Sequence, residues 1–123
     1  MAATHYYNFN PGLPEPFNVI HPFQLKSVMA FVKSDFPDEV ERIILFGGSL
    51  DLACGKYSDL DLYVIIDRGD PQEVYDKIHA LLSPLKKRFD VLVSHRDDFA
   101  AAAVERGTVE FKIKQKGVCI YAK

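Results

Sequence analysis

Two aspartates separated by one residue, Asp59 and Asp61, stand where a short apolar stretch begins, Leu60 to Ile66. Residues i and i+2 of a β-strand point to the same face, so the two carboxylates are expected to project side by side. Like charges that close repel each other unless a positive group lies between them. A divalent cation meets that need, and oxygen ligands suit Mg²⁺, with Mn²⁺ as the alternative ion.

A second chemical feature is the segment Gly47-Gly48-Ser49, which directly follows another apolar stretch. We expect it to open a short helix. Glycines let the backbone approach a ligand closely, and the free N–H groups at a helix start attract phosphate. Ser49 can cap that helix and donate its hydroxyl to a phosphate oxygen. A phosphate cradle beside metal-binding carboxylates predicts a nucleoside triphosphate bound together with its magnesium.

A third carboxylate, Asp90, begins a later apolar stretch, Phe89 to Val93. If that stretch forms a strand beside Leu60–Ile66, Asp90 reaches the same ions and completes a two-metal site. In such a site one ion lowers the pKa of the attacking hydroxyl and the other steadies the triphosphate. We therefore expect Asp90 to bind the first ion and to accept the proton of that hydroxyl.

The segments LFGGS (45–49) and SDLDL (58–62) resemble the signature of the nucleotidyltransferase superfamily of DNA polymerase beta. The size of the chain and the later Asp90 are similar to the minimal nucleotidyltransferases of that group. The resemblance implies the nucleotidyltransferase fold, an α/β (α+β) domain with a small mixed sheet of three to four strands flanked by helices. It also implies that Asp59, Asp61 and Asp90 are catalytic and hold two Mg²⁺ ions.

The resemblance assigns the triphosphate to the glycine-serine turn, and Ser58 joins the same nucleotide-binding set. Many members carry an arginine directly after the serine, where this chain has Leu50 followed by Asp51. Lys56 is the cation we expect in place of that arginine. Asp51 adds negative charge where phosphate approaches, which keeps a second hypothesis open: a catalytically weakened interaction module of the same fold that binds and blocks a partner protein.

The resemblance implies the transfer of a nucleoside monophosphate, AMP from ATP, to a hydroxyl of a protein or small-molecule acceptor. Minimal nucleotidyltransferases often work with a helical HEPN-type protein. The resemblance therefore also implies a role as the antitoxin half of a HEPN/MNT toxin–antitoxin pair. These activities and partners are expectations carried by the two motifs.

The composition favours one small globular domain. The chain has 123 residues, of which 48% are hydrophobic and 26% charged. We expect a proline-rich irregular arm over residues 1–22 and the nucleotidyltransferase domain over 23–123. Apolar runs of only a few residues argue against a membrane span, and the two cysteines without a CxxC motif favour a reduced, cytoplasmic protein.

Charge is spread unevenly along the chain. The net charge is −2, which gives no support for nucleic-acid binding. Residues 1–83 hold 6 basic and 12 acidic side chains, a net of −6, whereas residues 84–123 hold 9 and 5, a net of +4. Such asymmetry can mark a face that contacts a partner.

Hydrophobic periodicity and breaker residues predict the elements that must position these groups. Asp70 and Pro71 form a helix start, with Asp70 as the N-cap. The tail is ambiguous, because Val109, Phe111 and Ile113 alternate with polar and charged residues as in a strand, whereas Val109 and Ile113 also fit helical spacing. The resemblance favours a helix there. The predicted elements are a helix over 22–35, a strand over 42–46, a strand over 60–66, a helix from 71, a strand over 89–93, a helix over 97–106 and a strand over 118–121.

Overall fold

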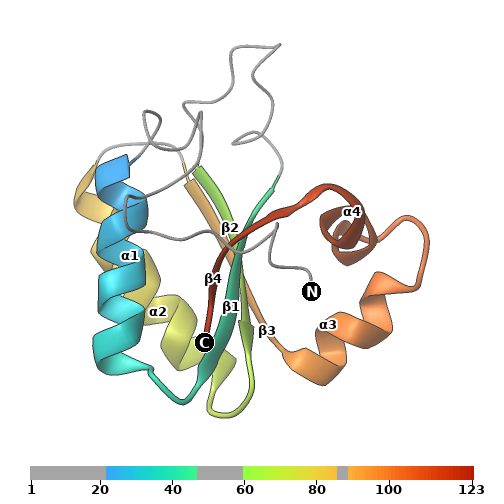
Figure 1. The fold of residues 1–123 in the computed structure, drawn as a ribbon, viewed down its shortest axis with the longest axis horizontal. Helices are drawn as coiled ribbons and strands as arrows, with labels where there is room; N and C mark the ends of the chain where they lie inside the picture. The colour runs from blue at the N-terminus through green and yellow to red at the C-terminus, as the bar shows by residue number, and fades with distance from the viewer. Residues whose placement is uncertain (1–21, 47–59, 86–88) are drawn as a thin grey trace.

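A computed structural model describes three segments of the chain, residues 22–46, 60–85 and 89–123. Figure 1 shows their helices and strands in order along the chain. No helix in these segments is long and apolar enough to cross a lipid bilayer. The elements are α1 (Pro22–Asp35), β1 (Val40–Leu45), β2 (Leu60–Ile66), α2 (Pro71–Leu82), the 3₁₀ turn η4 (Ser83–Leu85), β3 (Phe89–His95), α3 (Arg96–Ala103), α4 (Val109–Lys116) and β4 (Val118–Ala122).

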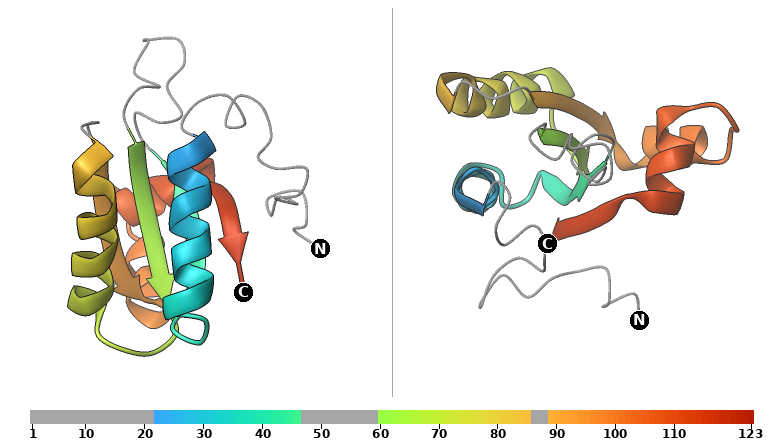
Figure 2. Two further views of the ribbon diagram at one scale, coloured as in Figure 1. Left: turned by 90° about the vertical axis from the view of Figure 1, so that its left-hand side faces the viewer. Right: turned by 90° about the horizontal axis from the view of Figure 1, so that it is seen from above.

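The four strands form one mixed sheet in the order β3-β2-β1-β4. β1 pairs antiparallel with both β2 and β4, whereas β2 and β3 are parallel. Parallel neighbours need a crossover connection, and here α2 provides it. α1 and α2 lie on one side of the sheet, and α3 and α4 lie on the other (Figure 2). The predicted fold class, a small mixed sheet flanked by helices, is confirmed.

The side chains of β2 alternate between two hydrophobic clusters, one on each face of the sheet. Leu60, Leu62, Val64 and Ile66 belong to the larger cluster, which includes the buried residues of α1 and α2. Tyr63 and Ile65 belong to the smaller cluster on the side of α3 and α4. Because both faces are covered over most of its length, β2 is almost continuously apolar, as is typical of buried strands.

Local capping signals account for the starts of the helices on the larger cluster. The carboxylate of Asp70 accepts a hydrogen bond from the backbone N–H of Gln72, at 3.0 Å, and Pro71 follows at the first position of α2. The predicted N-cap is therefore confirmed. The helix predicted over 22–35 is α1, and Pro22 is its first residue. Proline is well suited to that position because the first N–H of a helix has no partner within the helix.

The ambiguous tail is a helix, α4, followed by a strand. Thr108 caps α4: its hydroxyl accepts from the N–H of Phe111 at 3.0 Å and donates to the carbonyl of Ala102 at 2.8 Å. That second bond lies at the end of α3, which stops at Ala103, three residues before the predicted end. One hydroxyl therefore links the end of α3 to the start of α4.

A close backbone approach explains the glycine between α4 and β4. A Cβ added at Gly117 would lie 2.6 Å from the carbonyl oxygen of Ile113 and 2.6 Å from a methyl carbon of Ile44. Real Cβ atoms do not approach other atoms so closely. Gly117 thus lets α4 end directly against the sheet, before β4 pairs with β1.

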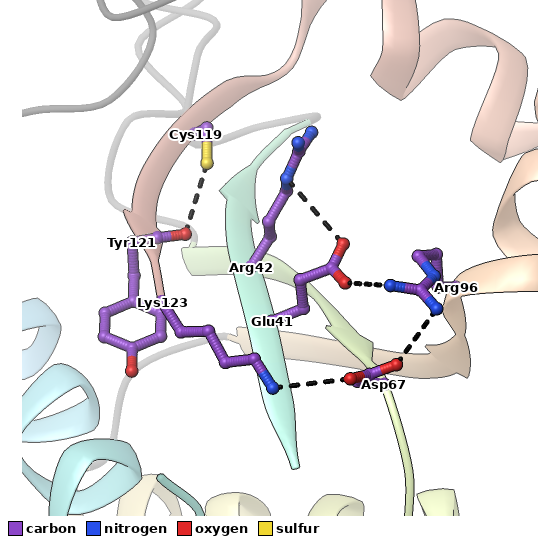
Figure 3. A network of polar contacts seen from close by, with 7 residues as sticks. All are labelled: Glu41, Arg42, Asp67, Arg96, Cys119, Tyr121 and Lys123. Carbon is purple, nitrogen blue, oxygen red and sulfur yellow. Dashed lines mark hydrogen bonds and ion pairs between the residues drawn. The ribbon is translucent and has the colours of Figure 1, made fainter. Parts of the chain in front are cut away.

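An ion-pair network joins β1 and α3 to the residues that directly follow β2 and β4, at the end of the sheet where β1 begins (Figure 3). The guanidinium of Arg96 lies 2.9 Å from a carboxylate oxygen of Glu41 and 3.1 Å from one of Asp67. Lys123 also pairs with Asp67, at 3.4 Å. Exposed pairs of this kind contribute little free energy individually, but the network fixes α3 and the last residue relative to the sheet.

The cap at Thr108 gives a test of the observed tail. Thr108→Ala removes the hydrogen bonds of the hydroxyl with Phe111, Ala102 and Glu105, so we expect the free energy of unfolding to fall by about 1 kcal/mol or somewhat more. Thr108→Ser keeps the hydroxyl and should lose less than half of that amount. Urea unfolding followed by circular dichroism measures both. Equal losses in the two variants would show that the methyl group, and not the cap, stabilises this region.

Candidate active site

Parallel pairing brings two of the predicted carboxylates together. Asp61 on β2 is the register partner of Asp90 on β3. Residues opposite each other on neighbouring strands share a face, and strands lie about 4.8 Å apart. Asp61 alternates with Leu60 and Leu62 of the larger cluster, so it lies on the side of α3 and α4. Asp90 is exposed and Asp61 is half-buried, which leaves the pair accessible at one end of the sheet.

The strand that leads to the glycine-serine segment ends beside the same pair. Leu45, the last residue of β1, is paired with Leu62, and the N–H of Phe46 donates to the carbonyl oxygen of Asp61 at 3.1 Å. The described segment that contains β1 therefore ends next to Asp61. The remaining predicted site residues, Gly47, Gly48, Ser49, Lys56, Ser58 and Asp59, and the short helix expected after Ser49, lie outside the described residues.

The carboxylates of Asp61 and Asp90 are suitable ligands for magnesium. Two carboxylates on adjacent parallel strands supply hard oxygen ligands and carry like charges at close range, which a divalent cation would offset. Within residues 22–46, 60–85 and 89–123, no group of three or more His, Cys, Asp or Glu side chains forms a metal site. The predicted third ligand, Asp59, is adjacent in sequence to the first residue of β2.

A partly buried polar cluster that the sequence analysis missed lies on the same face of the sheet. Tyr63 follows Asp61 by two residues and is only 2% exposed. Its hydroxyl lies 2.7 Å from the hydroxyl of Ser94 on β3 and donates to the carboxylate of Glu110 on α4 at 2.9 Å. Tyr63 therefore ties both site-bearing strands to α4. The even spacing of 61 and 63, and of 90 and 94, places these side chains on one face of the sheet, but it gives no sign that the Tyr63 hydroxyl is hydrogen-bonded.

The environment of Tyr63 favours its neutral form. Burial raises the pKa of its hydroxyl to about 12, and the negative charges of Glu110 and Asp98 act in the same direction, whereas the hydrogen bond with Ser94 opposes them. Its ring also packs edge-on against Phe99, with the ring centroids 5.1 Å apart. Tyr63 is thus a neutral, firmly packed hydrogen-bond donor beside the carboxylate pair.

Comparison with known proteins places one solved structure near this chain. No protein-family model matches the sequence, and no curated protein is significantly similar to it. Among solved structures, the chain is similar to one in the crystal structure of the toxin–antitoxin MntA-HepT. The alignment covers 82% of this chain and 72% of that chain, at a TM-score of 0.46 and 17% sequence identity. A likeness of this degree assigns no residue role.

The raised pKa of Tyr63 predicts a specific loss of stability at alkaline pH. The unfolded chain releases this proton near pH 10 and the folded chain near pH 12, so the folded state holds more protons between those values. Stability must then fall as pH rises through that range. We expect Tyr63→Phe to show a shallower fall than the wild type in urea unfolding between pH 9 and 12.

Comparing the wild type with Tyr63→Phe isolates the ionisation of the Tyr63 hydroxyl. Cys119, whose pKa burial raises to about 11, titrates in the same range but is present in both proteins and therefore cancels. Ser94→Ala is the matched control, because it removes the partner hydroxyl and leaves the tyrosine able to ionise. Identical pH profiles for the wild type and Tyr63→Phe would contradict the assignment.

Proposed function

We propose that this protein is a magnesium-dependent nucleotidyltransferase that transfers a nucleoside monophosphate, AMP from ATP, to a hydroxyl of a protein or small-molecule acceptor. The observation that carries the proposal is the register of β2 and β3, which makes Asp61 and Asp90 neighbours on one accessible face. The glycine-serine and DxD motifs of the sequence support it. The last residue of β1 comes just before the first motif and is paired with Leu62, which directly follows the second motif.

The proposed reaction assigns a task to each group. Asp59, Asp61 and Asp90 hold two Mg²⁺ ions, while Gly47, Gly48, Ser49, Lys56 and Ser58 hold the triphosphate. The acceptor oxygen attacks the α-phosphorus, the bond from that phosphorus to the β-phosphate oxygen breaks, and pyrophosphate leaves. The exposed carboxylate of Asp90 accepts the hydroxyl proton. Magnesium, when bound, offsets the charge of the triphosphate and lowers the pKa of the attacking hydroxyl.

The proposed biological setting is a pair with a helical HEPN-type protein, in which this chain acts as the antitoxin. This part of the proposal rests on the resemblance of the two sequence motifs to the minimal nucleotidyltransferases. The partner would then also be the natural acceptor. The second hypothesis, a module that only binds and blocks its partner, differs in one respect that can be measured, because it predicts no transfer of nucleotide.

Loss of either described carboxylate should abolish transfer. The purified protein is incubated with Mg²⁺ and ATP labelled at the α-phosphate, with and without cell lysate as a source of acceptor. We expect labelled product from the wild type and a decrease of at least about 100-fold for Asp61→Asn and for Asp90→Asn. The label must be on the α-phosphate, because a kinase would transfer only the γ-phosphate.

Asp35→Asn is the matched control for these variants. Asp35 is an exposed aspartate at the end of α1, before β1 begins, whereas the candidate site lies beyond the last residue of β1. It makes the same change of charge and should leave transfer within about two-fold of the wild type. Equal activity of all four proteins would refute the assignment, and no transfer by the wild type would favour the module that only binds.

Nucleotide binding can be tested without an acceptor. A non-hydrolysable ATP analogue with Mg²⁺, at about 100 times its Kd, should raise the free energy of unfolding by about 2.7 kcal/mol. The increase should vanish when EDTA removes the metal, and it should be lost in the Asp61→Asn/Asp90→Asn double variant. Thermal unfolding at several analogue concentrations measures it. An unchanged midpoint at millimolar analogue would contradict a triphosphate site.

A further inference from the structure

Two hollows lie on either side of the second half of α4 and meet at one residue. The first, about 460 Å³, lies among α3, α4 and the β1–β4 edge of the sheet. The second, about 570 Å³, lies along α4 beside the connection from α3. Gln115 lines both of them. We call the two hollows together the α4 groove.

The inner part of the α4 groove is apolar. Ile44 from β1, Phe99 from α3 and Ile113 from α4 line it. Val104, at the end of α3, also lines it and is 70% exposed, the most exposed large hydrophobic side chain of the described residues. A large hydrophobic side chain left in water beside an apolar hollow is a feature of surfaces that bind another molecule.

The outer part of the α4 groove is positively charged. Lys114 and Arg42 line the first hollow, where Arg42 also lies 4.0 Å from a carboxylate oxygen of Glu41, and Arg106, Lys112 and Lys116 line the second. No aspartate or glutamate is among the described residues that line either hollow. The cations of the network at the other end of the sheet, Arg96 and Lys123, are by contrast paired with carboxylates. A net charge of −2 for the whole chain makes this local excess of cations a distinct surface.

We propose that the α4 groove docks an acidic amphipathic segment of a partner protein, with apolar side chains in the inner part and carboxylates against the lysines of α4. Complementary charge steers such a segment to the groove and fixes its register. A helix that places one apolar face in a hydrophobic groove is a common form of such recognition. The two hollows share Gln115, so a segment that crosses α4 at that residue would reach both the apolar part and the charged part.

A protein segment fits the groove better than a nucleic acid does. Single-stranded nucleic acids bind by stacking successive bases on exposed aromatic rings. Two rings line the hollows, Phe99 and Phe111; both are half-buried, and the ring of Phe99 packs against Tyr63. The apolar inner part, with Val104 at its edge, has no counterpart in a sugar-phosphate backbone. These observations favour an acidic peptide over an RNA strand.

α4 is joined to the end of the sheet that carries the candidate site. α4 leads through Gly117 to Val118, which is paired with Leu45, the last residue of β1. The hydroxyl of Tyr63 also joins α4 to β2. A partner segment in the groove would therefore lie along the same face as Asp61 and Asp90. The docking itself requires no catalysis, so it stands even if nucleotide transfer is not observed.

The test uses a synthetic amphipathic helix, with leucines on one face and glutamates on the other, labelled for fluorescence anisotropy. The Lys112→Glu/Lys116→Glu variant of the full-length protein should bind it about ten-fold more weakly or worse, and raised salt should weaken wild-type binding. Val104→Ser should weaken it several-fold through the apolar contact. Both lysines are exposed, and circular dichroism checks that each variant is folded.

Three controls make the result decisive. Lys26→Glu/Lys77→Glu makes the same change of net charge on α1 and α2, across the sheet, and should bind within about two-fold of the wild type. Equal loss in this control, or equal binding of a peptide with glutamine in place of glutamate, would overturn the proposal. So would an oligouridine strand that binds more tightly than the peptide and displaces it, which would make the groove a nucleic-acid surface.

Discussion

The parallel pairing of β2 with β3 is the constraint on which the rest of the structure depends. It requires α2 as a crossover, and α2 in turn covers the larger hydrophobic cluster together with α1. The same register that places Val91 against Leu62 in that cluster places Asp90 beside Asp61 on the opposite face. A slip of one residue would turn Asp90 into the core and Val91 into solvent. Hydrophobic burial thus fixes the position of the carboxylates.

The two faces of the sheet are specialised. Among the described residues, the face under α1 and α2 is almost entirely apolar, so it contributes mainly to stability. The other face mixes the carboxylate pair, the Tyr63–Ser94–Glu110 cluster and the cations of α4 with a small apolar cluster. Buried polar groups are tolerated there because each finds a hydrogen-bond partner: among the described residues, none is left unsatisfied.

Local signals predicted most of the elements, and tertiary contacts decided the others. The strand β2 and the helix cap at Asp70 could be predicted from the residues next to them in sequence. The segment 109–113 fits two periods, and the end of α3 depends on the hydroxyl of Thr108 five residues beyond Ala103. Of the site, Asp61 and Asp90 could be predicted as a pair from strand starts alone. Tyr63 could not, because an aromatic residue in an apolar strand has the same pattern whether or not its hydroxyl is used.

On the face of the sheet under α3 and α4, negative and positive side chains lie over different strands. The carboxylates of Asp61 and Asp90 lie on β2 and β3, whereas the cations of the α4 groove lie over the β1–β4 side of the sheet. An acidic segment is attracted to α4 and repelled by the carboxylates, so charge alone keeps it from the place where a nucleotide and its metal would bind.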